Sequence, residues 1–396
     1  MRSWAPISDS GETAGVFIAV PRLSAERSPV TRKMVKCVAA DHSADGETVP
    51  ASCTLHPMNC AERVLTALRG EQPDRVPVIE SVIDVGVRRQ LFPDAVEIGA
   101  FSDAIGLDAV GTGCVFQHRN ETGSSYVDEW GVTYRKSKET LSHPVGSSIT
   151  NMDELRAYTP PDPDAAWRLG ELPGLVDRYK GQKAITFHHR AAFMWAAYLA
   201  GLDHLLLCFL DDPEFAHALM DIVVDTNITI ARRAVRAGVD VVILGDDYAH
   251  NFAPMMSPAH FEEFIFPRLK KTVDAIHEEG ALCIKHSDGN LWSILDFIVD
   301  AGPDAINPLE PVAGMDIGQV KAAYGDRVCL VGNIDCGELL SHGTREQVEA
   351  TVCHCIATAS PGGGFILSSS NSIHSSVRPD NYLAMVQACH AFGAYD

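Results

Sequence analysis

The strongest constraint on the fold is a repeat in the second half of the chain, in which short apolar segments end in polar side chains. The segments are 239–247, 281–290, 304–311, 327–336 and 364–372. Amphipathic helical stretches, such as 261–279 and 345–359, separate them. Strands that alternate with helices in this way predict an α/β fold, and we expect a (β/α)8 TIM barrel. Active sites of such barrels lie at the C-terminal ends of the strands, so the polar ends of these segments form the candidate site.

The first half of the chain supplies the remaining elements of this pattern. Candidate barrel strands are 75–80, 108–111 and 183–189, and helices are expected at 60–69, 191–199 and 213–237. Asn59 precedes the first helix and is a typical N-cap residue. The stretch 125–136 alternates apolar and polar residues around Gly131, which predicts an antiparallel hairpin inserted into the barrel.

The N-terminal segment differs in composition from the rest of the chain. Residues 1–57 are rich in Ser, Thr, Pro and Ala and show no sustained periodicity, so we expect a disordered extension there. Residues 58–396 are then the barrel domain, and Met58 is an alternative natural start of the protein.

Charge and cysteine content exclude several classes of function. The 32 Lys and Arg against 52 Asp and Glu give a net charge of −20, which argues against nucleic acid or an anionic membrane as the main partner. The apolar runs are also far shorter than a membrane span. The 11 cysteines are odd in number and contain no CxxC pair, which indicates reduced thiols and a cytoplasmic protein.

Two polar groups at neighbouring strand ends can carry chemistry. His286 and Asp288 are two residues apart, so on an extended strand end their side chains share one face. Such a pair can bind a metal or transfer a proton, or Asp288 can simply cap the next helix. Asp246 and Asp247 end the preceding strand and can bind metal, accept a proton or cap a helix, and only one of them can point inward.

The other strand ends add further candidates. Glu310 follows a stiff Asn-Pro-Leu segment and is a candidate catalytic carboxylate, or else a surface glutamate. His374, after the last strand, is a candidate for orienting substrate or handling protons, or else a packing residue. The candidates for substrate binding are His189, Asn307, Asn333, Asp335 and Asn371.

Several segments together resemble the uroporphyrinogen decarboxylase superfamily. They are AERVLTALRGEQPDRVP at 61–77, the run at 257–290, VGNIDCGELLSHG at 331–343, and 362–371. The resemblance extends over about residues 59 to 393. It implies the same barrel and one of two chemistries, because this superfamily uses a single fold for both.

The first chemistry is the decarboxylation of uroporphyrinogen in porphyrin and haem biosynthesis, without a cofactor. Members of that branch carry an arginine-bearing segment after the first strand, but the matching segment 81–89 lacks that signature. Asn371 stands where that branch has a histidine. A tetrapyrrole with many carboxylates is also a poor match to so acidic a protein.

The second chemistry is that of corrinoid-linked methyltransferases, many of which hold zinc with a His-x-Cys pair and a later Cys. His286 matches the first ligand, while Asp288 and Asn371 stand where the two cysteines would be. A harder metal site of His286 and Asp288, with Glu310 or Asp247, suits an oxygen of a methyl ether better than a thiol.

The resemblance therefore implies a zinc-assisted methyltransferase that passes a methyl group from a small molecule to a separate corrinoid protein. It also implies that a homodimer can form. Two alternatives remain open, namely a cofactor-independent uroporphyrinogen decarboxylase and a non-catalytic barrel that binds a tetrapyrrole or another small molecule.

Overall fold

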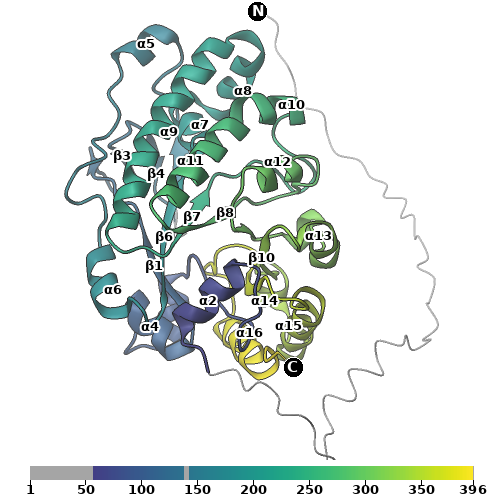
Figure 1. The fold of residues 1–396 in the computed structure, drawn as a ribbon. Coiled ribbons are helices and arrows are strands. Elements are labelled where there is room, and N and C mark those ends of the chain that lie inside the picture. Colours follow the sequence, from purple (N-terminus) through teal and green to yellow (C-terminus); the bar gives the residue numbers. More distant parts are fainter. Residues whose placement is uncertain (1–56, 138–141, 396) are drawn as a thin grey trace, which may run out of the picture. The chain divides into compact units, whose positions relative to one another are not determined.

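Seven parallel strands follow one another around a curved sheet in the order in which they occur in the chain. The strands are β1 (Ala109–Gly113), β6 (Ala184–Arg190), β7 (Val241–Gly245), β8 (Leu282–His286), β9 (Ala305–Asn307), β10 (Cys329–Ile334) and β11 (Phe365–Ser369). The structure is a computed structural model that describes residues 57–137 and 142–395, so the expected extension lies outside the described residues apart from Pro57. Figure 1 shows the helices around the outside of the strands.

An eighth segment closes the barrel, although it is not a regular strand. The predicted strand 75–80 forms only isolated bridges, from Arg75 to Ala394 and from Val78 to Leu367. The Leu367 N–H nevertheless donates to the Pro77 carbonyl at 2.9 Å on one side, and the Asp108 N–H donates to the Val78 carbonyl at 2.8 Å on the other. Because Pro77 has no backbone N–H, a continuous ladder cannot form here. The segment still joins β11 to β1, which confirms the predicted TIM barrel.

The helices largely follow the sequence pattern. α2 (Cys60–Leu68) begins with a capping box between Asn59 and Glu62, as the N-cap prediction requires. The predicted helix 261–279 is divided into a π-helical turn, Phe261–Ile265, and α11 (Phe266–Glu278). Pro267 lacks the N–H that a regular α-helix would need at this point, which accounts for the division. The other helices are α3 (Val85–Leu91), α4 (Ile98–Ile105), α5 (Met152–Ala157), α6 (Leu172–Tyr179), α7 (Phe193–Ala200), α8 (Leu202–Asp211), α9 (Pro213–Arg236), α10 (Pro258–His260), α12 (Leu295–Asp300), α13 (Ile317–Tyr324), α14 (Leu339–His342), α15 (Arg345–Ala359) and α16 (Pro379–Phe392).

A small antiparallel sheet is inserted between β1 and β6. It consists of β2 (His118–Arg119), β3 (Ser125–Asp128), β4 (Thr133–Arg135) and β5 (His143–Val145). The predicted hairpin is its β3–β4 unit, with Tyr126 opposite Tyr134. Trp130 in the β3–β4 turn is fully buried and stacks on Trp195 of α7, with ring centroids 5.1 Å apart. The insertion therefore packs against Trp195 at the end of the barrel where the strands terminate.

The interior of the barrel is filled by apolar side chains and is not a pore. Inward-facing residues of the strands form one cluster with Val64, Ala67 and Leu68 of α2. α2 thus covers the N-terminal end of the barrel, and the C-terminal end remains for the site. Among the described residues, no single helix is long and apolar enough to cross a membrane, and α7 with α8 reaches that size only as a pair bent by 100°.

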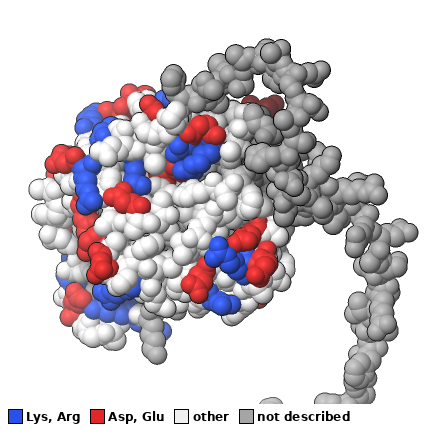
Figure 2. Space-filling view, turned by 90° about the horizontal axis from the view of Figure 1, so that it is seen from below, with Lys and Arg blue, Asp and Glu red and all other residues white. Residues whose placement is uncertain are grey.

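The charged residues are mixed on the face of the molecule that Figure 2 shows. Lys and Arg side chains there lie beside Asp and Glu side chains, with uncharged surface between them. Among the described residues on this face, there is consequently no extended basic surface of the kind that nucleic acid requires.

Candidate functional site

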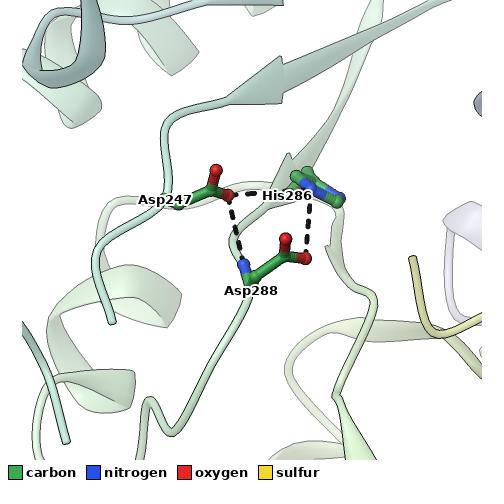
Figure 3. Close-up of side chains that lie close together, drawn as sticks. All are labelled: Asp247, His286 and Asp288. Carbon is green, nitrogen blue, oxygen red and sulfur yellow. Dashed lines mark hydrogen bonds and ion pairs between the residues drawn. The ribbon is translucent and has the colours of Figure 1, made fainter. Parts of the chain in front are cut away.

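Three side chains from two neighbouring strand ends converge at the C-terminal end of the barrel. His286 is the last residue of β8, Asp288 follows it, and Asp247 follows β7 (Figure 3). The His286 Nε2 atom lies 3.4 Å from Asp288 Oδ1 and 3.7 Å from Asp247 Oδ1. One ligand atom from each residue lies within 4.8 Å of the others, so the cluster can hold a metal ion. The predicted pair is thus completed by one of the two predicted aspartates.

The donor atoms of this cluster fit a divalent cation. Asp288 Oδ1 is buried and accepts no hydrogen bond among the described residues, which leaves a lone pair free for a ligand. The side chains of Asp247, His286 and Asp288 are 32%, 24% and 28% exposed, so an ion can reach them from solvent. Histidine nitrogen and aspartate oxygen are both ligands that zinc takes in proteins.

Two amide side chains and one carboxylate position the cluster. His286 Nδ1 lies 2.6 Å from Asn307 Oδ1, and the Asn307 amide nitrogen donates to the Val331 carbonyl at 3.3 Å. Because the amide nitrogen is engaged there, the amide oxygen faces the imidazole and accepts its Nδ1–H. The Nε2 lone pair then points to the two carboxylates, as a metal ligand requires.

A second set of contacts holds the segment after His286. The Asn371 amide donates to Asp288 Oδ2 at 2.7 Å and to Glu310 Oε1 at 3.4 Å. Glu310 Oε2 accepts the Gly289 N–H at 2.8 Å. Glu310 and Asn371 therefore fix the position of Asp288.

The environment moves the pKa values of the two aspartates in opposite directions. Burial raises the pKa of Asp288 to about 6, and the nearby Asp247 and Glu310 add to the effect against the opposing influence of His286. Burial also raises the pKa of Asp247, but His286, when it is protonated in the metal-free protein, and Arg190 outweigh it and hold this pKa below its ordinary value. Separation of two carboxyl groups in this way is typical of functional sites.

The cluster lies in the wall of a cavity of about 420 Å³. Apolar parts of the wall come from Phe116, Trp195 and Ile243. Its polar residues include Glu80, His188, His189, Arg190, Asn307, Ser368, Ser369 and Asn371. A cavity of this size, with one apolar and one polar side to its wall, suits one small molecule. A larger groove of about 800 Å³ between α9 and α11 lies on the outside of the barrel, away from the strand ends.

The structure distinguishes between the adjacent aspartates. Asp246 is fully buried and accepts the backbone N–H groups of Ala192, Phe193 and Met194 at 2.8, 2.9 and 3.3 Å. It therefore holds the start of α7 and does not line the cavity. Asp247 is the one that faces inward.

Four other predicted residues are engaged elsewhere. The Asn333 amide donates to the Leu309 carbonyl at 2.9 Å, and Asp335 accepts backbone N–H groups of the turn before α14. His374 Nδ1 accepts the Ser376 N–H at 3.3 Å. His189 contributes to the cavity wall, but its Nε2 lies 2.9 Å from the Asn227 carbonyl of α9.

Two charged residues of the cavity wall were missed by the sequence analysis. Arg190 ends β6, one residue beyond the predicted strand, and Glu80 ends the segment that closes the barrel. Glu80 accepts hydrogen bonds from the hydroxyls of Ser368 and Ser369 at 3.0 and 2.8 Å. Burial raises its pKa to about 7. Both residues stand at the polar end of an apolar strand segment, and the same pattern in the sequence identified His286 as a candidate.

Comparisons with known proteins agree with this architecture. The family model "Uroporphyrinogen decarboxylase (URO-D)" matches residues 131–392. A uroporphyrinogen decarboxylase from Psychromonas ingrahamii is 28% identical over 184 residues, which cover 45% of this chain and 49% of that protein. Another from Pseudoalteromonas atlantica is 27% identical over 259 residues, which cover 62% of this chain and 70% of that protein.

A relative with a different activity matches equally well. The methylated-thiol–coenzyme M methyltransferase of Methanosarcina mazei is 26% identical over 244 residues, covering 59% of this chain and 63% of that protein. The chain thus spans about half of the first relative and less than two thirds of this one.

A solved structure shares the fold. A methyltransferase from Methanosarcina mazei superposes with a TM-score of 0.68 at 21% identity, over 84% of this chain and 99% of that structure. Since the family model covers well over half of the sequence, the chain belongs to the uroporphyrinogen decarboxylase (URO-D) family.

Proposed function

We propose that this protein is a metal-assisted methyltransferase that takes a methyl group from a small methylated molecule, such as a methyl ether. Zinc would be held by Asp247, His286 and Asp288, and the acceptor would be a corrinoid carried by a separate protein over the mouth of the barrel. The observation that carries the proposal is the convergence of one imidazole nitrogen and two carboxylate oxygens in the wall of a small cavity. Similarity to the methyltransferase of M. mazei supports it.

A bound zinc ion would supply a Lewis acid next to the ether oxygen. Asn307 keeps the Nε2 atom of His286 available as a ligand, and Asn371 with Glu310 holds Asp288 in place. Phe116 and Trp195 give the substrate an apolar surface and exclude water. Glu80, with a pKa of about 7, is partly protonated at neutral pH and can give a proton to the leaving oxygen.

The composition of the cavity wall favours this function over decarboxylation of a tetrapyrrole. Among the described residues, Arg190 is the one lysine or arginine in the wall. A porphyrinogen with many carboxylates would need more cationic partners than that. A non-catalytic barrel would instead bind a small molecule without turnover.

The test combines metal content with activity. Purified, chelator-washed and zinc-reconstituted protein should hold zinc near one equivalent and transfer a methyl group from a methyl ether to cob(I)alamin. His286→Ala and Asp288→Ala should lose both properties. His354→Ala and Asp326→Ala, which change exposed residues away from the cavity, are the matched controls and should retain them.

Three results would contradict the proposal. The first is methyl transfer that survives in both site variants. The second is wild-type protein that binds no zinc. The third is conversion of uroporphyrinogen to coproporphyrinogen, which would establish the decarboxylase alternative.

A further inference from the structure

The cavity contains a cation that the proposed metal site does not use. Arg190 lines the cavity at the end of β6. Among residues 57–137 and 142–395, no group accepts a hydrogen bond from its guanidinium and no carboxylate lies within ion-pair distance. Its guanidinium carbon lies 5.7 Å from the centroid of the Tyr198 ring. A half-buried guanidinium that faces a cavity with unused donors can bind an oxyanion there.

The strand register places Arg190 at the same level as the metal cluster. Arg190 pairs with Gly245 on β7, and the next strand pairs Leu244 with Lys285, one residue before His286. Arg190 and His286 are therefore separated by a single strand, which corresponds to about 10 Å between their backbones. Both side chains belong to the layer that faces the cavity.

The residue between them is a glycine, which leaves the space above it open. Gly245 has no positive φ that would require glycine for backbone reasons. A Cβ atom built on it would lie 3.7 Å from Arg190 Nη1 and 3.8 Å from Arg190 Cγ, against the side chain itself. A side chain at this position would therefore lie against Arg190, between the guanidinium and the strand end that carries His286.

Among the described residues, the polar groups around the guanidinium leave its N–H donors without a hydrogen bond. Burial lowers the pKa of His188 to about 4, so this neighbour is neutral. Glu80 is occupied by the hydroxyls of Ser368 and Ser369. Asp246 and Asp247 attract the guanidinium electrostatically, but neither forms an ion pair with it. Asp246 is held by backbone N–H groups at the start of α7, and Asp247 belongs to the proposed metal site.

We propose that Arg190 binds an anionic group, a carboxylate or a sulfonate, of the small molecule that occupies the cavity. The anion is held at Arg190, and the opposite end of the same molecule reaches the cluster of Asp247, His286 and Asp288. The apolar middle of the molecule contacts Trp195 and Phe116. Combined with the proposed function, on which this part rests, the substrate is a small methylated acid. The anion site itself does not depend on the reaction.

The experiment measures binding without turnover. 4-Methoxybenzoate and its neutral counterpart 4-methoxybenzamide are titrated calorimetrically into full-length protein, both zinc-loaded and metal-free. The wild type should bind the carboxylate about ten- to a hundredfold more tightly than the amide, as expected for a charge-assisted contact. Arg190→Gln should abolish this preference, and Arg190→Lys should keep part of it. Arg156→Gln, on an exposed arginine of α5, is the matched control.

Several outcomes would overturn the inference. One is an equal affinity of the wild type for 4-methoxybenzoate and 4-methoxybenzamide. A second is that the wild type binds neither 4-methoxybenzoate nor a sulfonate analogue. Another is a preference that survives Arg190→Gln and disappears when zinc is removed, because the anion would then be on the metal. Melting temperatures of the variants show whether they are folded. Loss of methyl transfer with an intact Arg190-dependent preference would contradict the proposed function and leave this inference standing.

Discussion

Asn307 accepts the Nδ1–H of His286 at 2.6 Å, and this contact joins the ends of β9 and β8. The contact selects the tautomer of the imidazole whose Nε2 lone pair faces Asp247 and Asp288. A carboxylate or carbonyl partner of this kind is a regular feature of metal-binding histidines. The strand that follows the cluster thus prepares its nitrogen ligand before any ion arrives.

Removal of that contact should weaken metal binding. We expect Asn307→Ala to lower the zinc affinity by about ten- to a hundredfold, because the imidazole loses its orientation and tautomer. Competition with a chromophoric chelator measures the change. Asn151→Ala, at an exposed helix cap, is the control and should bind zinc as the wild type does. An unchanged affinity in Asn307→Ala would mean that His286 is not a ligand.

Glu310 should act through an oxygen atom and not through its charge. Its Oε2 accepts the Gly289 N–H at 2.8 Å, and a glutamine offers the same oxygen. We expect Glu310→Gln to keep most of the zinc affinity, whereas Glu310→Ala should lose it and destabilise the fold by about 1 kcal/mol. Zinc titration and thermal unfolding of both variants measure this. If both lose zinc equally, the negative charge itself contributes to the site.

Glu80 should make the stability of the protein depend on pH. Burial raises its pKa from 4.5 to about 7, so between these values the folded state binds more protons than the unfolded state. The contribution of Glu80 to the free energy of unfolding is therefore fully present below pH 4.5 and is lost as the pH rises through 7. From pH 5 to pH 8, Glu80→Gln should gain up to about 3 kcal/mol relative to the wild type.

Urea unfolding at the two pH values measures this difference, and Glu71→Gln, on an exposed glutamate, is the control. A constant difference between Glu80→Gln and wild type across this range would contradict the raised pKa.

Asp108 should be the most costly carboxylate to remove outside the site. It is fully buried, accepts Arg63 Nη1 at 2.7 Å and Arg75 Nη2 at 2.8 Å, and also accepts the Val78 N–H at 2.8 Å. These contacts hold α2 and the closing segment against β1. We expect Asp108→Ala to lower the free energy of unfolding by about 3 kcal/mol, because Arg75 loses its carboxylate partner and Arg63 keeps only Asp74.

Equilibrium unfolding in urea tests this, with Asp108→Asn as a milder variant that retains an acceptor for Val78. Asp153→Ala removes an exposed partner of Arg156 and should change stability by less than about 1 kcal/mol. A similar small effect for Asp108→Ala would show that the barrel does not depend on this network for its closure.

Local sequence patterns were sufficient for the fold and for part of the site. The alternation of apolar strands and amphipathic helices predicted the barrel, and α15 has the predicted bounds of 345 and 359. Side-chain alternation along a strand end placed His286 and Asp288 on one face, because this rule depends only on extended backbone. The irregular first strand was less predictable, since its pairing depends on Pro77 and on two partners far along the chain.

Only the tertiary structure decided which neighbouring side chains complete the site. Alternation ends where the strand ends, and Asp246 directly after β7 has a φ of 131°, which turns its carboxylate to the backbone of α7 and leaves Asp247 facing His286. Arg190 joins the same cavity through its register with Gly245 on another strand. Backbone direction at a turn and register between distant strands both arise from long-range packing. The sequence by itself therefore determined the strands and their polar ends. The assembled barrel decided which of those ends meet, because only packing brings distant strands into register.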